Sequence, residues 1–148
     1  MTHTVRRASD GDLAGLLALY RHLGPDDPAP TIEQARATWE ALIASPMTHV
    51  VVADADGLVA ASCLLVIVPN LTRGARPFAV IENVVTDPRY RRRGLGTAVL
   101  HFAVAAAWDR GCYKVMLASG RTDDATLRFY EKAGFARGGK TFFEVRRL

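Results

Sequence analysis

The chain has 148 residues, enough for one domain with a single buried core. Hydrophobic residues make up 49% of it, charged residues 23%, and the formal net charge is +4. This balance indicates neither a disordered nor a fibrous protein, and the modest net charge does not by itself indicate nucleic-acid binding, which usually needs a broad basic face. Because the N-terminus has no apolar signal core and no apolar run could span a bilayer, we expect a cytoplasmic protein without a membrane partner, organised as one domain over residues 1–148.

The first half of the chain predicts one strand, two helices and a hairpin. Ser9 or Asp10 can cap the first helix, whose apolar residues recur at helical spacing and stop at Gly24. Thr31 and Gln34 form a capping box for the second helix. Asp56-Gly57 is a hairpin turn signal between two apolar, β-branched runs. The predicted strands of this half are residues 5–8, 49–53 and 58–68.

The second half predicts strands that alternate with helices. A polar, turn-rich loop over residues 69–77 leads into the strand, and a helix begins near Leu95 and ends near Arg110. A second helix ends at Gly134, after an acidic start at which Asp123 can act as the cap. The predicted strands of this half are residues 78–86, 114–118 and a closing strand over 141–146. The order indicates a mixed α/β fold.

The segment from Asn83 to Thr97 joins an apolar strand to a glycine-lined helix start that carries Arg91, Arg92 and Arg93. Unpaired N–H groups and the positive end of the dipole favour an anion at such a start, and glycines let phosphate oxygens approach the amides. Arginines add charge and forked donors. We therefore predict a diphosphate site here, with Arg92 and Arg93 as its direct partners; the alternative for the three arginines is a solvated charge run. Arg89 is expected to face solvent.

The glycine spacing distinguishes between phosphate loops. A Walker loop has four residues between its glycines, whereas Gly94 and Gly96 are separated by one. A dinucleotide fingerprint needs a third Gly or Ala at position 99, where this chain has Val, and an acidic residue after a second strand, which is missing. Neither alternative fits.

Three motifs in this order resemble the GNAT superfamily of N-acetyltransferases. Residues 91–96 match its acyl-coenzyme A loop, Arg or Gln, two residues, Gly, one residue, Gly or Ala. Residues 80–85 resemble its fourth strand, with an Ile-Glu pair as in glucosamine-phosphate N-acetyltransferases, and residues 129–135 resemble its late helix with the tyrosine. The resemblance implies an α/β fold with a mixed, mostly antiparallel central sheet, splayed middle strands and about four flanking helices.

The resemblance also implies the cofactor contacts. Acetyl-CoA is the expected co-substrate, with backbone groups of Val84 and Val85 on its pantetheine arm, and one of these two N–H groups on the thioester oxygen. The loop residues expected to hold the diphosphate are Arg91, Arg92, Arg93, Gly94, Leu95, Gly96 and Thr97. The alternative for the two valines is a purely structural role, in which they pack in a buried strand.

Two further residues are expected to carry the chemistry. Tyr130 lies where the family has its general acid, which protonates the departing thiolate; the alternative is a core tyrosine packed beside Phe129. Glu82 is a carboxylate in a mid-sheet strand and shares a face with Val84 by simple alternation. It either takes a proton from the incoming ammonium or pairs with an arginine.

The expected reaction is direct acetyl transfer to a primary amine of a small acceptor, conceivably an amino sugar phosphate. The first two helices and residues 70–77 would shape its pocket, with Arg73 and Arg76 binding an anionic group. Acetylation of protein N-termini or lysines, and a non-catalytic CoA-binding or basic nucleic-acid-binding module, are the alternatives. Cys63 and Cys112 are expected as buried thiols, the histidines share no metal spacing, and a homodimer is possible.

Overall fold

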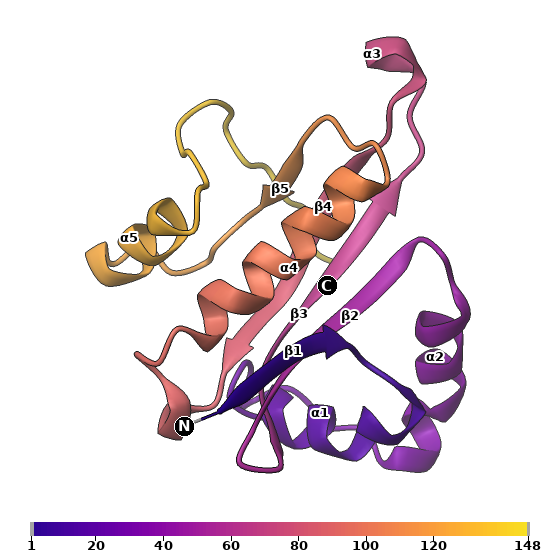
Figure 1. Cartoon of the computed structure of the whole chain (residues 1–148), viewed down its shortest axis with the longest axis vertical. Helices are drawn as coiled ribbons and strands as arrows, with labels where there is room; N and C mark the ends of the chain where they lie inside the picture. The colour runs from indigo at the N-terminus through magenta and orange to yellow at the C-terminus, as the bar shows by residue number, and fades with distance from the viewer. Residues whose placement is uncertain (1, 148) are drawn as a thin grey trace. The chain divides into compact units, whose positions relative to one another are not determined.

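Residues 2–147 are described in a computed structural model, in which the chain forms two compact units, Met1–Leu117 and Ala118–Leu148. The first unit holds every strand and four of the helices (Figure 1). In chain order its elements are β1 His3–Arg7, the 3-10 turn η1 Asp10–Asp12, α1 Leu13–Tyr20, α2 Ile32–Ala44, β2 Thr48–Ala55, β3 Leu58–Val68, α3 Thr72–Ala75, β4 Phe78–Thr86, the 3-10 turn η2 Pro88–Tyr90, α4 Leu95–Asp109 and β5 Val115–Leu117. The second unit contains α5, Asp124–Lys132.

The five strands form one mixed sheet in the order β1-β2-β3-β4-β5. Neighbours from β1 to β4 pair antiparallel, and β5 pairs parallel to β4. The expected class, a mostly antiparallel α/β sheet of GNAT type, is confirmed. The predicted bounds of β3 and β4 are confirmed residue for residue, because the apolar runs there stop at turn-forming residues on both sides.

The two faces of the sheet are covered by different helices. Leu13 and Leu16 of α1 and Trp39 of α2 pack on Val50 and Val52 of β2. On the other face lies α4, where the Cys63 thiol of β3 contacts the Val99 carbonyl at 3.6 Å. Consecutive residues of a strand point to opposite faces, so Leu64, which packs on the α1 and α2 cluster, and Cys63 mark the two sides.

Helix ends follow the predicted caps. Thr31 and Gln34 form the expected capping box of α2, with Thr31 Oγ1 accepting from the Gln34 N–H and Gln34 Oε1 accepting from the Thr31 N–H. The first helix is shorter than expected: α1 ends at Tyr20, and a turn carries the chain on through Leu23. One helical turn, α3, lies in the loop predicted to be irregular, and it contains left-handed Arg73 and Gly74.

In the second unit, α5 begins at the predicted cap, because Asp123 Oδ2 accepts from the Thr126 N–H at 3.1 Å. The closing strand expected over residues 141–146 is wrong: residues 141–147 form no strand. A strand needs a hydrogen-bonded neighbour, and no ladder among residues 2–147 includes this segment. Its alternating sequence leaves large apolar side chains in solvent, at Phe142, Phe143 and Val145.

Candidate active site

Strand β4 leaves the ladder halfway along its length. Its pairs with β5 end at Ile81 and Leu117, while β4 itself continues to Thr86. On the other side, the register against β3 shifts at this point, with Ser62 opposite Val85 and Leu64 opposite Glu82. Two β4 residues, Asn83 and Val84, therefore oppose a single β3 residue, which defines a β-bulge. Bulge and strand separation together produce the splay that the family resemblance implied.

The bulge corrects the faces expected from simple alternation. Glu82 pairs with Leu64 and Val85 with Ser62, and these two partners are two residues apart on β3, so they share a face. Glu82 and Val85 consequently lie on the same face, the one covered by α1 and α2. The prediction that Glu82 faces with Val84 and opposite Val85 is wrong, because the inserted residue resets the alternation.

The backbone of Asn83 makes the bulge possible. Its φ is +55°, in the left-handed region that asparagine tolerates better than other residues with a Cβ. Asn83 is exposed and its side chain lines a cavity. Sequence reasoning assigned no role to Asn83, although an asparagine inside an otherwise apolar strand is the one signal of a bulge that the sequence offers.

Val84 and Val85 differ in which way their amides point. The Asp87 N–H donates to the Ala60 carbonyl of β3 at 2.8 Å. Alternation along the extended strand then directs the N–H of Val85 toward β3 as well, and the N–H of Val84 toward the side that β5 has left. Of the two valines expected to offer free backbone groups, Val84 is therefore the one that faces the open edge.

Glu82 is exposed, which removes the expected burial. Among residues 2–147 no ion pair includes it, so the structural role as a partner of Arg73 or Arg76 is wrong for this chain. It stands directly before Asn83 on the face of the sheet that bears α1 and α2. A solvated carboxylate beside the cavity is accessible to an amine.

A short turn anchored by Asp87 connects β4 to the glycine loop. Its carboxylate is 8% exposed and accepts from the Arg89 N–H at 2.9 Å and from the Arg89 Nη2 at 2.7 Å. These hydrogen bonds lower the pKa of the Asp87 carboxyl to about 2. The expectation that Arg89 simply faces solvent is therefore incomplete: the side chain is exposed, but its charge neutralises Asp87.

The glycine loop has a backbone shaped for close approach. Arg92 has φ +61°, and Gly94, the N-cap of α4, has φ +80°. No side chain caps this helix, and a Cβ built on Gly94 would meet nothing within 4 Å. The first amides of α4 have no partner inside the helix by geometry. Leu95 is buried and holds the helix start in the core, while the amides open outward.

The three arginines of this loop are all exposed. The Arg93 guanidinium lies 5.3 Å from the centre of the Tyr90 ring, which is itself buried. Together with Arg91 and Arg92 it places several cationic groups around an uncapped helix N-terminus. This is the chemistry that binds a diphosphate.

A cavity of about 590 Å³ opens between α1, α2 and the bulge. This confirms the prediction that the first two helices form a wall of a cleft. Most of its lining is apolar, and the polar groups include Tyr20, Arg21, Gln34, Thr38 and Asn83. Arg21 makes no ion pair among the described residues, and sequence reasoning missed it, because one arginine at the end of a helix carries no distinguishing pattern.

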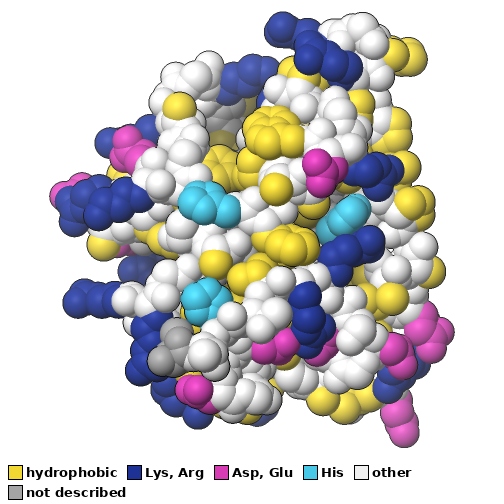
Figure 2. Space-filling model, in the orientation of Figure 1, with side chains coloured by type: hydrophobic (Ala, Val, Ile, Leu, Met, Phe, Trp, Pro, Cys, Tyr) yellow, Lys and Arg dark blue, Asp and Glu magenta, His cyan; other side chains and the backbone are white. Residues whose placement is uncertain are grey.

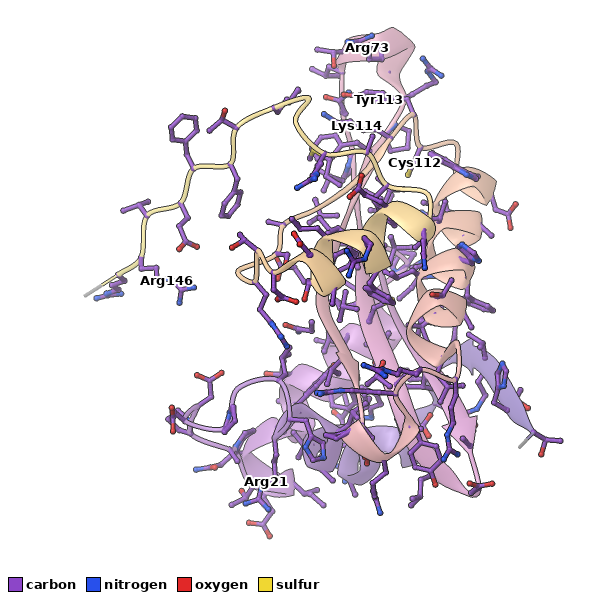
Figure 3. All side chains as sticks on the ribbon, turned by 90° about the vertical axis from the view of Figure 1, so that its left-hand side faces the viewer. Arg21, Arg73, Cys112, Tyr113, Lys114 and Arg146 are labelled. Carbon is purple, nitrogen blue, oxygen red and sulfur yellow. The ribbon has the colours of Figure 1, made fainter. Side chains whose placement is uncertain are left out.

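Residues 70–77 do not line this cavity. Arg73 and Arg76 lie 5.5 and 5.7 Å from the centre of the Tyr113 ring, at the end of β4 where the strand begins. Figure 3 labels Arg73, Tyr113 and Lys114 at one end of the first unit and Arg21 at the other, and Figure 2 shows basic side chains gathered over α3. From Phe78 to Asn83, β4 alone spans about 16 Å. The structure thus separates the two predicted anion-binding arginines from the cavity of the same protomer.

Tyr130 belongs to the last turn of α5 in the second unit. Its half-buried ring contacts Phe129 at 4.9 Å and Phe135 at 6.4 Å between centres, both edge to face. The phenol is thus held in an aromatic cluster.

Both cysteines are buried, as expected. Burial raises the pKa of Cys63 to about 12, which keeps that thiol protonated. Residues 2–147 contain no group of three or more His, Cys, Asp or Glu side chains placed to hold a metal ion. Nor does any helix in this range have the length and apolar character needed to cross a bilayer.

Comparison with known proteins agrees with this site. The family model for the acetyltransferase (GNAT) family matches residues 9–135. Glucosamine 6-phosphate N-acetyltransferase of Trypanosoma brucei brucei is 37% identical over 131 residues, covering 88% of this chain and 87% of that protein. The chain therefore belongs to the GNAT family and is an N-acetyltransferase.

Solved structures support the same assignment. The structure described as "Putative acetyltransferase from Agrobacterium tumefaciens str. C58" has a TM-score of 0.92 and 47% identity, over 97% of this chain and 99% of that one. An aminoglycoside N-acetyltransferase in complex with CoA shares the fold, with a TM-score of 0.81 and 17% identity, over 99% of this chain and 96% of that one. CoA is thus a ligand of proteins with this fold.

Proposed function

We propose that the protein transfers the acetyl group of acetyl-CoA to the primary amine of a small acceptor, by direct attack within a ternary complex. The observation that carries the proposal is the uncapped start of α4 at left-handed Gly94, next to the open, bulged half of β4. The family match spans residues 9–135, parts of both units, which supports one N-acetyltransferase domain over the chain. We infer a cytoplasmic location, where acetyl-CoA is available.

We assign the cofactor contacts as follows, on the support of this geometry. The diphosphate binds the amides that open α4, with Arg91, Arg92 and Arg93 as charged partners. The pantetheine arm pairs with the open edge of β4, and the Val84 N–H donates to the thioester oxygen. That hydrogen bond strengthens as the oxyanion forms, so it lowers the barrier to attack.

The acceptor amine must have a free lone pair before it can attack the thioester carbon. Glu82 takes the proton of the incoming ammonium, directly or through water. The nitrogen then forms its bond to the carbonyl carbon, and the tetrahedral intermediate collapses with cleavage of the carbon–sulfur bond. Tyr130 gives its proton to the departing thiolate, and the second proton, which the nitrogen loses as the amide forms, restores the phenol; this role rests on the family resemblance.

We propose an amino sugar phosphate as the acceptor class. The similar T. brucei protein is named for glucosamine 6-phosphate, and a cavity of this volume suits a small molecule. Protein acetylation is less well supported, since an N-alpha-acetyltransferase relative matches only 57% of the chain. Arg21 is the cation of the cavity itself and is assigned to the anionic group.

Arg73 and Arg76 contact the same acceptor only if a second copy of the chain provides them. They lie a strand length from the cavity of their own protomer. The side chains of Phe143 and Val145 are also exposed to solvent, in a segment that has no strand partner. Such exposed apolar side chains are typical of an interface with another molecule. We therefore propose a homodimer in which these arginines complete the partner's acceptor site.

Mixed dimers test this arrangement. Glu82→Gln and the double variant Arg73→Ala/Arg76→Ala are each expected to be nearly inactive toward the acceptor. If the arginines act across the dimer, unfolding the two together and refolding them restores about a quarter of the activity, since half of the dimers carry one intact site of two. No recovery, with a dimer confirmed by light scattering, would contradict a contribution across the dimer, and an active double variant would place the arginines outside the acceptor site.

The reaction itself is tested by release of the CoA thiol over a panel of amines. Amino sugar phosphates should give the highest kcat/KM, and the corresponding unphosphorylated sugars a much lower one. Tyr130→Phe should reduce kcat at least tenfold with little change in acetyl-CoA affinity, because only proton donation is lost. Tyr113→Phe, which also loses a phenol but keeps its ring, is the matched control and should retain wild-type turnover.

Turnover only on peptides would replace the small acceptor with a protein substrate. Tight binding to DNA with a steep salt dependence, and none to acetyl-CoA, would replace the enzyme with a nucleic-acid-binding module.

A further inference from the structure

The turn between β4 and the glycine loop contains a buried carboxylate for which the reaction has no direct use. Asp87 is 8% exposed, and it does not line the cavity. A buried carboxylate close to a predicted diphosphate site is unfavourable by itself, because two negative charges repel each other. Its presence there requires a compensating role.

The contacts of Asp87 all serve one turn. Its Oδ1 accepts from the Arg89 N–H at 2.9 Å, its backbone N–H donates to the Ala60 carbonyl of β3, and its own carbonyl accepts from the Tyr90 N–H at 2.8 Å. Pro88 fixes the first residue of η2. The turn is thereby fastened both to the sheet and to itself.

The negative charge of Asp87 is neutralised by the neighbouring Arg89 guanidinium. The Arg89 Nη2 lies 2.7 Å from Oδ2, and the His22 Nε2 lies 3.9 Å from the same atom. His22 comes from the turn after α1, next to Arg21 and Leu23 of the cavity lining. Asp87 therefore also connects the glycine loop to the helix that forms the acceptor wall.

The glycine loop beyond this turn is held mainly at its ends. At the far end, α4 begins in the core with buried Leu95. At the near end, the Asp87 turn leads into left-handed Arg92, and the buried Tyr90 ring lies under Arg89 and Arg93. The path of the amides between the two ends depends on the position of both anchors.

We propose that Asp87 is a positioning residue for acetyl-CoA binding: its side chain caps the turn that aims the glycine loop, and Arg89 neutralises its charge so that the diphosphate can bind nearby. This inference rests on the proposed function. It assigns the contribution of Asp87 chiefly to the hydrogen bond it accepts from the Arg89 N–H, and less to its charge.

The chain offers a matched control. Asp12 is a second carboxylate that is 10% exposed, accepts from the Ser9 N–H at 2.7 Å and pairs with Arg6 at 2.7 Å. It stabilises the turn before α1 and does not touch the glycine loop. Loss of Asp12 therefore reproduces the general cost of losing a buried, paired, capping carboxylate.

Calorimetry with acetyl-CoA, together with thermal unfolding, tests the proposal on four variants. Asp87→Ala should weaken acetyl-CoA binding about tenfold, which corresponds to about 1.4 kcal/mol and lies within the range for loss of a cap. Asp87→Asn removes the charge but keeps an oxygen that accepts from the Arg89 N–H, and should stay within about threefold of wild type. Arg89→Ala leaves the Asp87 charge uncompensated near the diphosphate and should weaken binding more than about threefold. Asp12→Ala should lower the melting temperature without changing the affinity.

The outcomes distinguish the proposed function from the positioning role of Asp87. If the wild-type protein fails to bind acetyl-CoA, the proposed function fails. If it binds and Asp87→Ala binds equally well, or Asp12→Ala weakens binding as much, the positioning role fails. Should Asp87→Ala not fold, Asp87→Glu decides: it keeps the charge but displaces the capping oxygen, so weaker binding supports the proposal and wild-type binding overturns it.

Discussion

The two halves of strand β4 have similar sequences but differ in how their backbones are paired. Phe78–Ile81 lies between β3 and β5, with Ala79 and Ile81 buried and its backbone paired on both sides. Glu82–Thr86 keeps β3 as its neighbour but has lost β5, and it carries a left-handed residue and an exposed carboxylate. The first half resembles an ordinary central strand, and the second half forms part of the candidate active site.

The difference shows how the fold produces a binding edge. A paired strand has no backbone groups to offer, whereas a strand whose neighbour departs presents N–H and C=O groups in a fixed direction. A bulge at the point of departure sets which residue offers them. Changes in the first half should therefore affect stability, and changes in the second half or in the loop after it should affect function.

The largest effect is expected at Gly94. Gly94→Asp places a Cβ and a carboxylate where the diphosphate is expected, and it strains a left-handed backbone. Acetyl-CoA should bind at least about a hundredfold more weakly by calorimetry. Gly57 offers a matched control, since its φ is +78° and it also has nothing within 4 Å of a built Cβ, but it lies in the β2–β3 turn. Equal loss of affinity in Gly57→Asp would contradict the loop assignment.

The next effect concerns stability and belongs to the paired half. Ile81→Ala leaves a cavity between the sheet and α4, because the side chain is 1% exposed and pairs with Leu65. The free energy of unfolding in urea should fall by about 2 to 4 kcal/mol. The KM for acetyl-CoA, measured well below the melting temperature, should not change. A raised KM at full folding would mean that the two halves of β4 are not separable.

A smaller effect is expected at Glu82, in the open half. Glu82→Gln removes the proposed base but keeps the size of the side chain, so kcat/KM for the acceptor should fall about tenfold to a hundredfold. Affinity for acetyl-CoA and the melting temperature should remain at wild-type values, because the side chain is exposed. Wild-type turnover in this variant would assign the proton transfer to water or to another group.

The smallest effect is the acid stability of the Asp87 turn. The carboxyl has a folded-state pKa of about 2, below the usual value near 3.8, so the folded state holds its proton more weakly than the unfolded state. Its stabilising contribution is complete above about pH 4 and is lost as the pH falls toward 2. Asp87→Asn should flatten the stability curve in this window. An unchanged slope, with the exposed Asp26→Asn as reference, would contradict the pairing of Asp87 with Arg89.

The sequence predicted the regular elements well where local signals were strong. Apolar runs bounded by turn-forming residues fixed the bounds of β3 and β4, and the Thr31 capping box fixed the start of α2. The closing strand over residues 141–146 was predicted from its local sequence, but pairing depends on a neighbour that no local pattern specifies. Strand propensity alone does not supply the partner.

The parts of the site that were missed depend on tertiary structure. The bulge at Asn83 reverses the face of Glu82, and its only sequence signal is an asparagine in an apolar strand. Arg21 lines the cavity because the turn after α1 lies beside it. Arg73, which was expected to line it, contacts the Tyr113 ring instead. Asp87-Pro88 does signal a turn, yet its burial and its pairing with Arg89 are visible only in the structure.

The central claim is that the amides opening α4 hold the diphosphate of acetyl-CoA. A crystal structure of the protein with acetyl-CoA tests it most directly. The account predicts phosphate oxygens within hydrogen-bond distance of backbone N–H groups between Arg92 and Thr97, with the thioester oxygen facing the Val84 N–H. Phosphorus atoms bound at any other surface of the molecule would contradict it.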